Sequence, residues 1–143
     1  MSTAILAPAA ILVLWSLIML FWMAGTRLPA MKAGGTDLSQ SPPGGRGQDL
    51  EGVLPDKVNW KAHNYSHLME QPTIFYATVL ILAMAEAGHG LNLYLAWIYV
   101  GLRIAHSLWQ VTVNLVKVRF LLFVASTICL LIMSINPIWA TLF

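Results

Sequence analysis

The stretch STAILAPAAILVLWSLIMLFWMAGT, from Ser2 to Thr26, contains no charged residue. A helix needs ~20 apolar residues to span the hydrocarbon core of a bilayer, so this run is long enough to cross one. The run is longer than the apolar region of a signal peptide and has no basic start before it. We therefore expect a membrane-spanning helix and not a cleaved leader.

The composition of the whole chain agrees with a membrane protein. Of its 143 residues, 58% are hydrophobic and 10% are charged, whereas a soluble domain has ~25% charged residues. Long continuous apolar runs argue against a transmembrane barrel, whose strands alternate over roughly ten residues. The net charge of +2 comes from scattered cations, which gives no nucleic-acid surface. The sequence predicts an all-α integral membrane protein with a single domain over residues 1–143.

Four transmembrane helices forming a bundle are predicted at about residues 4–26, 58–87, 91–115 and 120–143. Prolines and glycines are concentrated between the first two helices, and they predict a polar loop over residues 27–57. Pro72 lies inside the second predicted helix, where a missing N–H predicts a bend near Glu70.

Positive charges predict the orientation of these helices. Cations fall in or beside the first loop and in the third loop, and none falls in the second: Arg27, Lys32, Arg46, Lys57 and Lys61, then Lys117 and Arg119. Because cytoplasmic loops carry the excess of lysine and arginine, the first and third loops are expected in the cytoplasm. Both termini of this multi-pass protein then lie outside.

Polar and ionisable residues within the predicted helices form two clusters. Ionisable groups inside a membrane are costly, and they usually have a functional role or a partner. The spacing within each cluster places its members on one helix face. The first cluster comprises His63, His67 and Glu70, and the second comprises Arg103, His106 and Gln110.

Folding the chain into a hairpin near His89 brings Glu70 level with His106 and Gln110, with Arg103 about one 5.4 Å turn deeper. One interpretation is that Glu70 and Arg103 form only a structural ion pair. Another is a metal or haem site, because imidazole and carboxylate are plausible ligands, although no CxxC or HExxH motif strengthens it. A third is a ligand site.

The segment KAHNYSHLME, from Lys61 to Glu70, resembles the Arg-Ala-His-x-Asn-x-x-Glu signature of the MAPEG family, the membrane-associated proteins of eicosanoid and glutathione metabolism. The segment from Leu102 to His106 resembles the family's Arg-x-x-His signature. Arg119 falls where the family places the arginine that acts on the glutathione thiol, and Arg27 where a further glutathione-binding arginine lies. The resemblance covers roughly residues 5–133.

The chain departs from the family pattern at several positions, which bears on ligand specificity. With Glu70 aligned, His67 occupies the position of the signature's asparagine and His63 that of an arginine. Gln110 stands where a ligand-contacting tyrosine is usual. The resemblance is therefore to a divergent, bacterial-type member, which implies the inner membrane.

The resemblance implies a homotrimer that uses glutathione as co-substrate in a transferase or peroxidase reaction on apolar small molecules entering from lipid. It implies a catalytic role for Arg119 and ligand binding by the remaining candidates: Arg27, His63, His67, Glu70, Arg103, His106 and Gln110. Such roles suit the ligand, because the carboxylates of glutathione need cations and its ammonium needs an acid. The alternative is a non-catalytic lipid-binding protein or an accessory subunit of a larger membrane complex, which the substituted His67 and Gln110 favour.

Overall fold

The protein is described by a computed structural model that places residues 2–142. All regular structure in this part of the chain is helical, as the sequence predicts. The five α-helices are α1 (Leu6–Ala33), α2 (Asp56–Leu68), α3 (Gln71–Met84), α4 (Leu91–Thr112) and α5 (Val116–Leu142). Two short 3₁₀ helices, η1 (Leu38–Gln40) and η2 (Gly47–Leu50), lie in the segment between α1 and α2.

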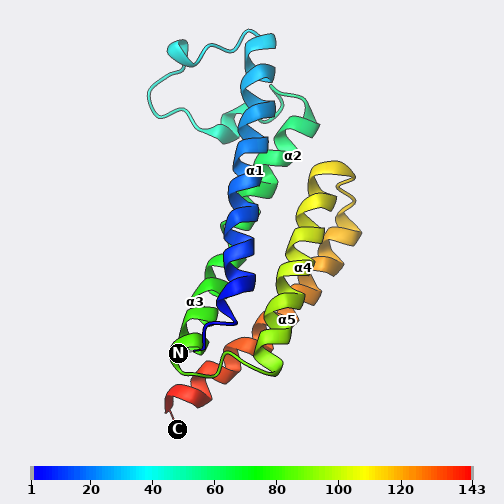
Figure 1. Ribbon diagram of the computed structural model, residues 1–143. Coiled ribbons are helices and arrows are strands. Elements are labelled where there is room, and N and C mark those ends of the chain that lie inside the picture. The colour runs from blue at the N-terminus through cyan, green and yellow to red at the C-terminus, as the bar shows by residue number, and fades with distance from the viewer. Residues whose placement is uncertain (1, 143) are drawn as a thin grey trace.

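The helices run roughly along one long axis (Figure 1). Helix α1 packs against α2 and α3, while α4 and α5 form an antiparallel pair that contacts them. The α1–α2 segment lies at one end of the molecule, and both chain ends lie at the other, beside the α3–α4 turn. Helices α1 and α2 extend beyond the α4–α5 turn, so the α1–α2 segment stands clear of that turn.

The core is made by apolar side chains from α1, α3, α4 and α5, with contributions from α2. The rings of Phe75 and Tyr99 stack with centroids 4.3 Å apart and an interplanar angle of 19°. Hydrogen bonds cross between the same helices: Tyr99 donates to Gln71 Oε1 at 3.1 Å, and Gln71 Nε2 donates to Thr127 at 2.8 Å. Close packing and such interhelical hydrogen bonds hold helices together where lipid replaces water.

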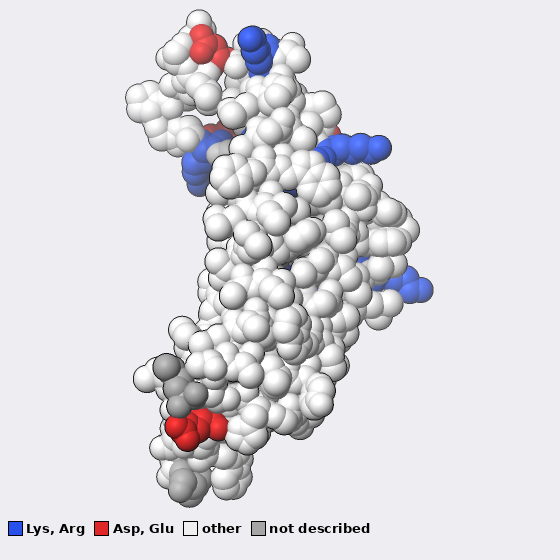
Figure 2. Space-filling model, in the orientation of Figure 1, with Lys and Arg blue, Asp and Glu red and all other residues white. Residues whose placement is uncertain are grey.

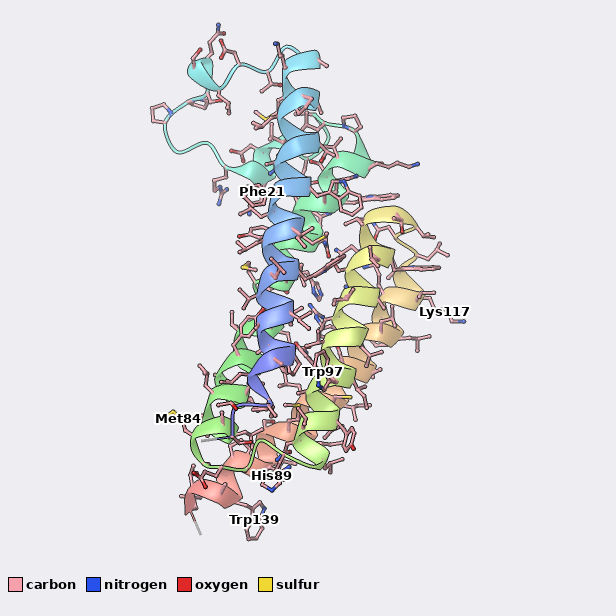
Figure 3. The ribbon with its side chains drawn as sticks, in the orientation of Figure 1. Phe21, Met84, His89, Trp97, Lys117 and Trp139 are labelled. Carbon is pink, nitrogen blue, oxygen red and sulfur yellow. The ribbon has the colours of Figure 1, made fainter. Side chains whose placement is uncertain are left out.

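The outer surface carries many large apolar side chains. Phe21 on α1 is 74% exposed and Met84 at the end of α3 is 75% exposed (Figure 3). Figure 2 shows a broad uncharged area on the face it presents, with a cation at its right edge and the other charged side chains nearer the top and bottom. Among the described helices, α1 and α5 are both long and apolar enough to cross a membrane. This surface suits contact with lipid chains.

Three predicted boundaries need correction. The fourth helix begins at Val116 and not near residue 120, so Lys117 and Arg119 lie in α5 and not in the third loop. The first helix continues past residue 26 to Ala33, with Pro29 inside it, so the polar loop begins later than residue 27. The φ angle of proline fits a helix, and its neighbours Leu28, Ala30 and Met31 are strong helix formers. The predicted second helix, 58–87, is two helices, α2 and α3, with a break at Met69 and Glu70.

Candidate functional site

The break between α2 and α3 creates the first element of the site, and it occurs where the bend near Glu70 was predicted. Pro72 lies in the first turn of α3 and lacks the N–H that would bond to the Leu68 carbonyl in a continuous helix. Glu70 has a ψ of −95°, outside the helical region. The last carbonyls of α2 therefore need donors from elsewhere.

Arg103, on α4, supplies such a donor. Its Nη2 lies 3.1 Å from the His67 carbonyl oxygen and 2.7 Å from His67 Nδ1. Because a guanidinium only donates hydrogen bonds, Nδ1 must accept, and a neutral imidazole then carries its proton on Nε2. Arg103 is only 1% exposed, and its Nε and Nη1 have no hydrogen-bond partner among the described residues. It thus fixes the ring of His67 while two of its donor atoms remain unused.

The ring of His67 is the centre of an aromatic group. It stacks on His106 of α4, with centroids 4.7 Å apart, and meets the edge of Phe123 of α5 at 5.6 Å. A hollow of about 180 Å³ lies beside these rings. Its walls come from α2, α4 and α5: His67, His106, Val116, Arg119, Phe120 and Phe123. We call this the arginine–histidine hollow.

Arg119 reaches this hollow from the first turns of α5. Its Nη1 donates to Asn114 Oδ1 at 2.6 Å, and its Nε has no hydrogen-bond partner in the described part of the chain. Asn114 adopts a left-handed conformation, with φ of 58°, in the turn between α4 and α5. Asparagine tolerates this conformation better than most residues. The turn therefore helps to hold the guanidinium at the wall of the hollow.

Gln110 and Glu70 lie outside the lining of the arginine–histidine hollow. Gln110 is 2% exposed, and its Oε1 has no hydrogen-bond partner within residues 2–142. Glu70 is exposed and makes no ion pair with Arg103 in the described structure. The expected structural pair is therefore wrong for this chain. The helical phase that placed Glu70 on the face of His67 is lost at the break after Leu68.

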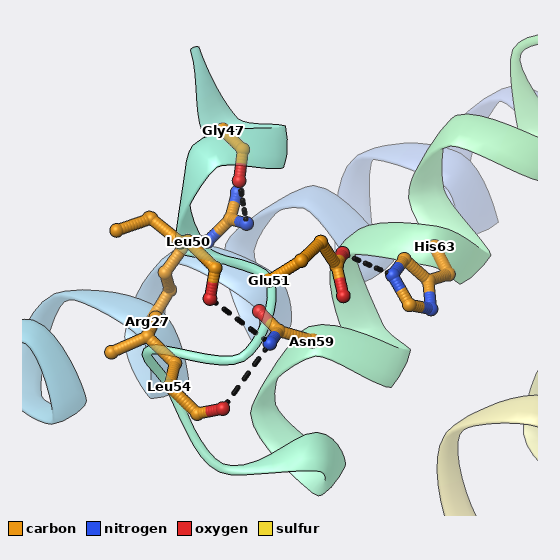
Figure 4. A network of polar contacts seen from close by, with 7 residues as sticks. All are labelled: Arg27, Gly47, Leu50, Glu51, Leu54, Asn59 and His63. Carbon is orange, nitrogen blue, oxygen red and sulfur yellow. Dashed lines mark hydrogen bonds and ion pairs between the residues drawn. The ribbon is translucent and has the colours of Figure 1, made fainter. Parts of the chain in front are cut away.

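Arg27 and His63 lie at a second hollow of about 210 Å³, near the α1–α2 segment. Figure 4 shows the polar contacts at this place. Arg27 Nη2 donates to the carbonyl of Gly47 at 2.8 Å, and His63 Nε2 pairs with the carboxylate of Glu51. Because this hollow holds Arg27 and His63 with Glu51, we call it the loop hollow. The predicted ligand residues thus fall into two groups within one chain.

The candidate metal ligands do not all gather at one place in the described part of the chain. Within residues 2–142, no three side chains of the His, Cys, Asp and Glu types come together closely enough to hold a metal ion. His63 lines the loop hollow, whereas His67 and His106 line the arginine–histidine hollow.

Sequence reasoning missed three residues that shape these hollows: Glu51, Asn114 and Phe123. The turn at Asn114 was predictable, because an asparagine between two helical segments is typical of a left-handed turn. Phe123 follows Arg119 by one helical turn, so the helical spacing alone places both on one face. No sequence signal pairs Glu51 with His63.

Comparison with known proteins gives one match. The model of the MAPEG family matches residues 5–139. No curated protein and no solved structure matches the chain. The matched range includes every residue of both hollows.

Proposed function

Because this chain belongs to the MAPEG family, whose members include glutathione transferases, peroxidases and non-catalytic proteins, we propose that it is a membrane-bound glutathione-dependent transferase or peroxidase. Its second substrate is an apolar electrophile. The observation that carries this proposal is the position of Arg119, which lines one hollow together with His67 and His106.

The chemistry of this hollow suits a thiolate. The reactive form of a thiol is the thiolate, and a neighbouring guanidinium favours it. Arg119 has an Nε–H without a partner within residues 2–142, and His67 carries a proton on Nε2. Both are donors for an anion. In the transferase reaction the thiolate sulfur forms a bond to the electrophilic carbon, and the leaving group departs with its electron pair.

The remaining candidate residues are proposed to bind the carboxylates and the ammonium group of glutathione. Arg27 and His63 lie together at the loop hollow and suit its carboxylates. Glu70 is exposed, and its carboxylate suits an ammonium group. Arg103 acts by orienting His67, and Gln110 supplies an amide oxygen one turn from His106.

We assign this protein four transmembrane spans and a homotrimeric assembly. Homotrimers are typical of the family. Within one chain, Arg27 and Arg119 line different hollows. In an assembly with sites between subunits, residues of one copy lie beside those of another. The apolar uncharged surface gives the electrophile a route from lipid. We place the first and third loops in the cytoplasm and both termini outside the inner membrane.

The test is direct. The purified protein in lipid bilayers is expected to bind glutathione in calorimetry and to consume it with an apolar electrophile. Turnover without the protein, and with Arg119→Leu, provides the controls. If the protein neither binds glutathione nor consumes it with any of several electrophiles, the enzyme proposal fails.

A second candidate is a non-catalytic lipid-binding protein or an accessory subunit of a membrane complex. Two observations favour it. Gln110 replaces the tyrosine usual at a ligand contact, and Arg103 has a structural role as the donor to the end of α2. An oligomer that stays folded and binds lipid, but never binds glutathione, supports this candidate.

A further inference from the structure

The segment between α1 and α2 does not stand free of the helices but is tied to both. Arg27 of α1 holds the carbonyl of Gly47 at 2.8 Å, and His63 of α2 holds the carboxylate of Glu51. Asn59 of α2 donates to the carbonyls of Leu50 and Leu54, each at 3.3 Å. Figure 4 shows these contacts around one short stretch of backbone. We call residues 47–51 the strap.

The strap fits closely at its first residue. A Cβ atom added to Gly47 would lie 2.9 Å from Arg27 Nη1 and would force the two groups apart. Leu54, just beyond the strap, is 4% exposed and anchors the end of the segment. Because Nη1 ends a flexible side chain, alanine at position 47 would displace the guanidinium from its present place against the strap at modest cost.

Two of the side chains that tie the strap down, Arg27 and His63, are also groups that a carboxylate ligand would use. Arg27 and His63 line the loop hollow together with Gly47, Gln48 and Glu51 from the strap itself. Glu51 already presents a carboxylate to His63, and the Gly47 carbonyl already accepts from Arg27. The strap thus offers these two groups the same kinds of acceptor atoms as a carboxylate ligand.

We propose that the strap is autoinhibitory, with the Glu51 carboxylate standing in for a ligand carboxylate at Arg27 and His63. A ligand that carries a carboxylate must displace Glu51 and lift the strap before it can bind there. This inference rests on the proposed function, because it takes the loop hollow as the carboxylate end of the thiol site. The new element is that the Glu51 side chain competes with the ligand carboxylate for the loop hollow.

The competition predicts the effect of removing the charge on Glu51. Glu51→Gln keeps the volume of the side chain but removes the charge that competes with the ligand. When the binding of one group affects the binding of another, the affinity typically changes 5- to 150-fold. We expect affinity for glutathione, and for the dicarboxylate glutarate as a simpler probe, to rise about 5- to 10-fold, at the lower end of that range.

A matched control is available in the same loop. Asp37 accepts a hydrogen bond from the Ser39 N–H and does not line the loop hollow. Asp37→Asn removes the same charge, and its amide oxygen still accepts that bond. Its affinity for both probes should equal that of the unmodified protein.

Hydrogen exchange measures the strap without any ligand. In the intact protein in bilayers, amides of residues 47–54 should exchange faster in Glu51→Gln and in Gly47→Ala than in Asp37→Asn. Added glutathione should accelerate the same amides in the unmodified protein. Slower or unchanged exchange in both strap variants would overturn the proposal.

The calorimetric outcomes separate the two proposals. Tighter binding by Glu51→Gln alone supports the strap. Equal binding by all three proteins overturns the strap and leaves the proposed function standing. Weaker binding by Glu51→Gln than by the unmodified protein overturns the strap alone, whereas both proposals fail if none of the three proteins binds glutathione.

Discussion

Arg103 Nη2 lies 2.7 Å from Nδ1 of His67 and 3.1 Å from the carbonyl oxygen of the same residue. One guanidinium nitrogen thus donates hydrogen bonds to both the ring and the backbone carbonyl of His67, near the end of α2. At the break, the His67 carbonyl accepts a long bond from the Glu70 N–H, at 3.4 Å, and Arg103, whose side chain is almost fully buried, adds a second donor. Arg103 therefore links the helix break to the orientation of the imidazole at the hollow.

This contact predicts different stabilities for two charge-removing variants. Arg103→Leu removes the donor to the half-buried Nδ1 of His67 and one of the two donors to its carbonyl. A buried acceptor left without a donor costs about 1 to 3 kcal/mol. We expect a clearly lower melting temperature in detergent for this variant. Glu70→Gln changes an exposed side chain and should alter the free energy of unfolding by no more than about 0.5 kcal/mol.

Thermal melts of both variants beside the unmodified protein check this difference. Equal losses in the two variants would restore the ion-pair interpretation of Glu70 and Arg103. Unchanged melting of Arg103→Leu would show that the contact with His67 contributes nothing to stability.

The fold was predictable where local pattern decides it. The uncharged run from Ser2 to Thr26 predicts the helical part of α1 that enters the core through Leu12 and Met19. Pro72 predicts the bend, since its missing N–H is a local property. Pro29 misled the prediction of the loop, because a single lost hydrogen bond did not outweigh the helix-forming residues around it.

The candidate site was predictable only in part. Helical spacing brings Arg103 and His106 to the buried face of α4, as expected. The same reasoning failed for Glu70, because a periodicity argument is valid only within an unbroken helix. The contact of Glu51 with His63 joins a loop without periodicity to a helix, and such non-local pairing leaves no pattern in the sequence.

Gln71 provides a prediction about the core. It accepts from Tyr99 and donates to Thr127, so it joins α3 to both α4 and α5. Gln71→Leu keeps a similar volume but leaves both hydroxyls without these partners, at a cost of about 1 to 3 kcal/mol. Thermal melts in detergent should show this loss, and Thr127→Val should show a smaller one. A variant as stable as the unmodified protein would contradict the role of this amide.

The orientation in the membrane can be tested by labelling single cysteines in a Cys129→Ser background. Arg46→Cys lies between α1 and α2, and His89→Cys lies between α3 and α4. Because cations are concentrated in and beside the first loop, a membrane-impermeant thiol reagent added outside intact cells should label position 89 and not position 46. Labelling after lysis serves as the control for reactivity. The reverse pattern would invert the proposed topology.

The last prediction concerns Arg119, which should be needed for turnover and much less for folding. Its contact with Asn114 is local to the α4–α5 turn, and its side chain is only partly buried. Arg119→Leu is therefore expected to leave the oligomeric state and the melting temperature of the protein nearly unchanged. Loss of a preorganised donor to a developing or bound anion corresponds to roughly 10² to 10³ in rate.

Lys117 offers the matched control for this variant. It is an exposed cation two residues earlier on α5, and its side chain points away from the helices (Figure 3). Lys117→Leu removes the same charge from the same helical turn of α5, and Lys117 does not line the arginine–histidine hollow. Glutathione conjugation to an apolar electrophile, measured in bilayers, should fall by orders of magnitude in Arg119→Leu and stay near the unmodified rate in Lys117→Leu. Equal rates for the two variants would mean that Arg119 does not act on the thiol, and a catalytic group would then have to be sought elsewhere in the hollow.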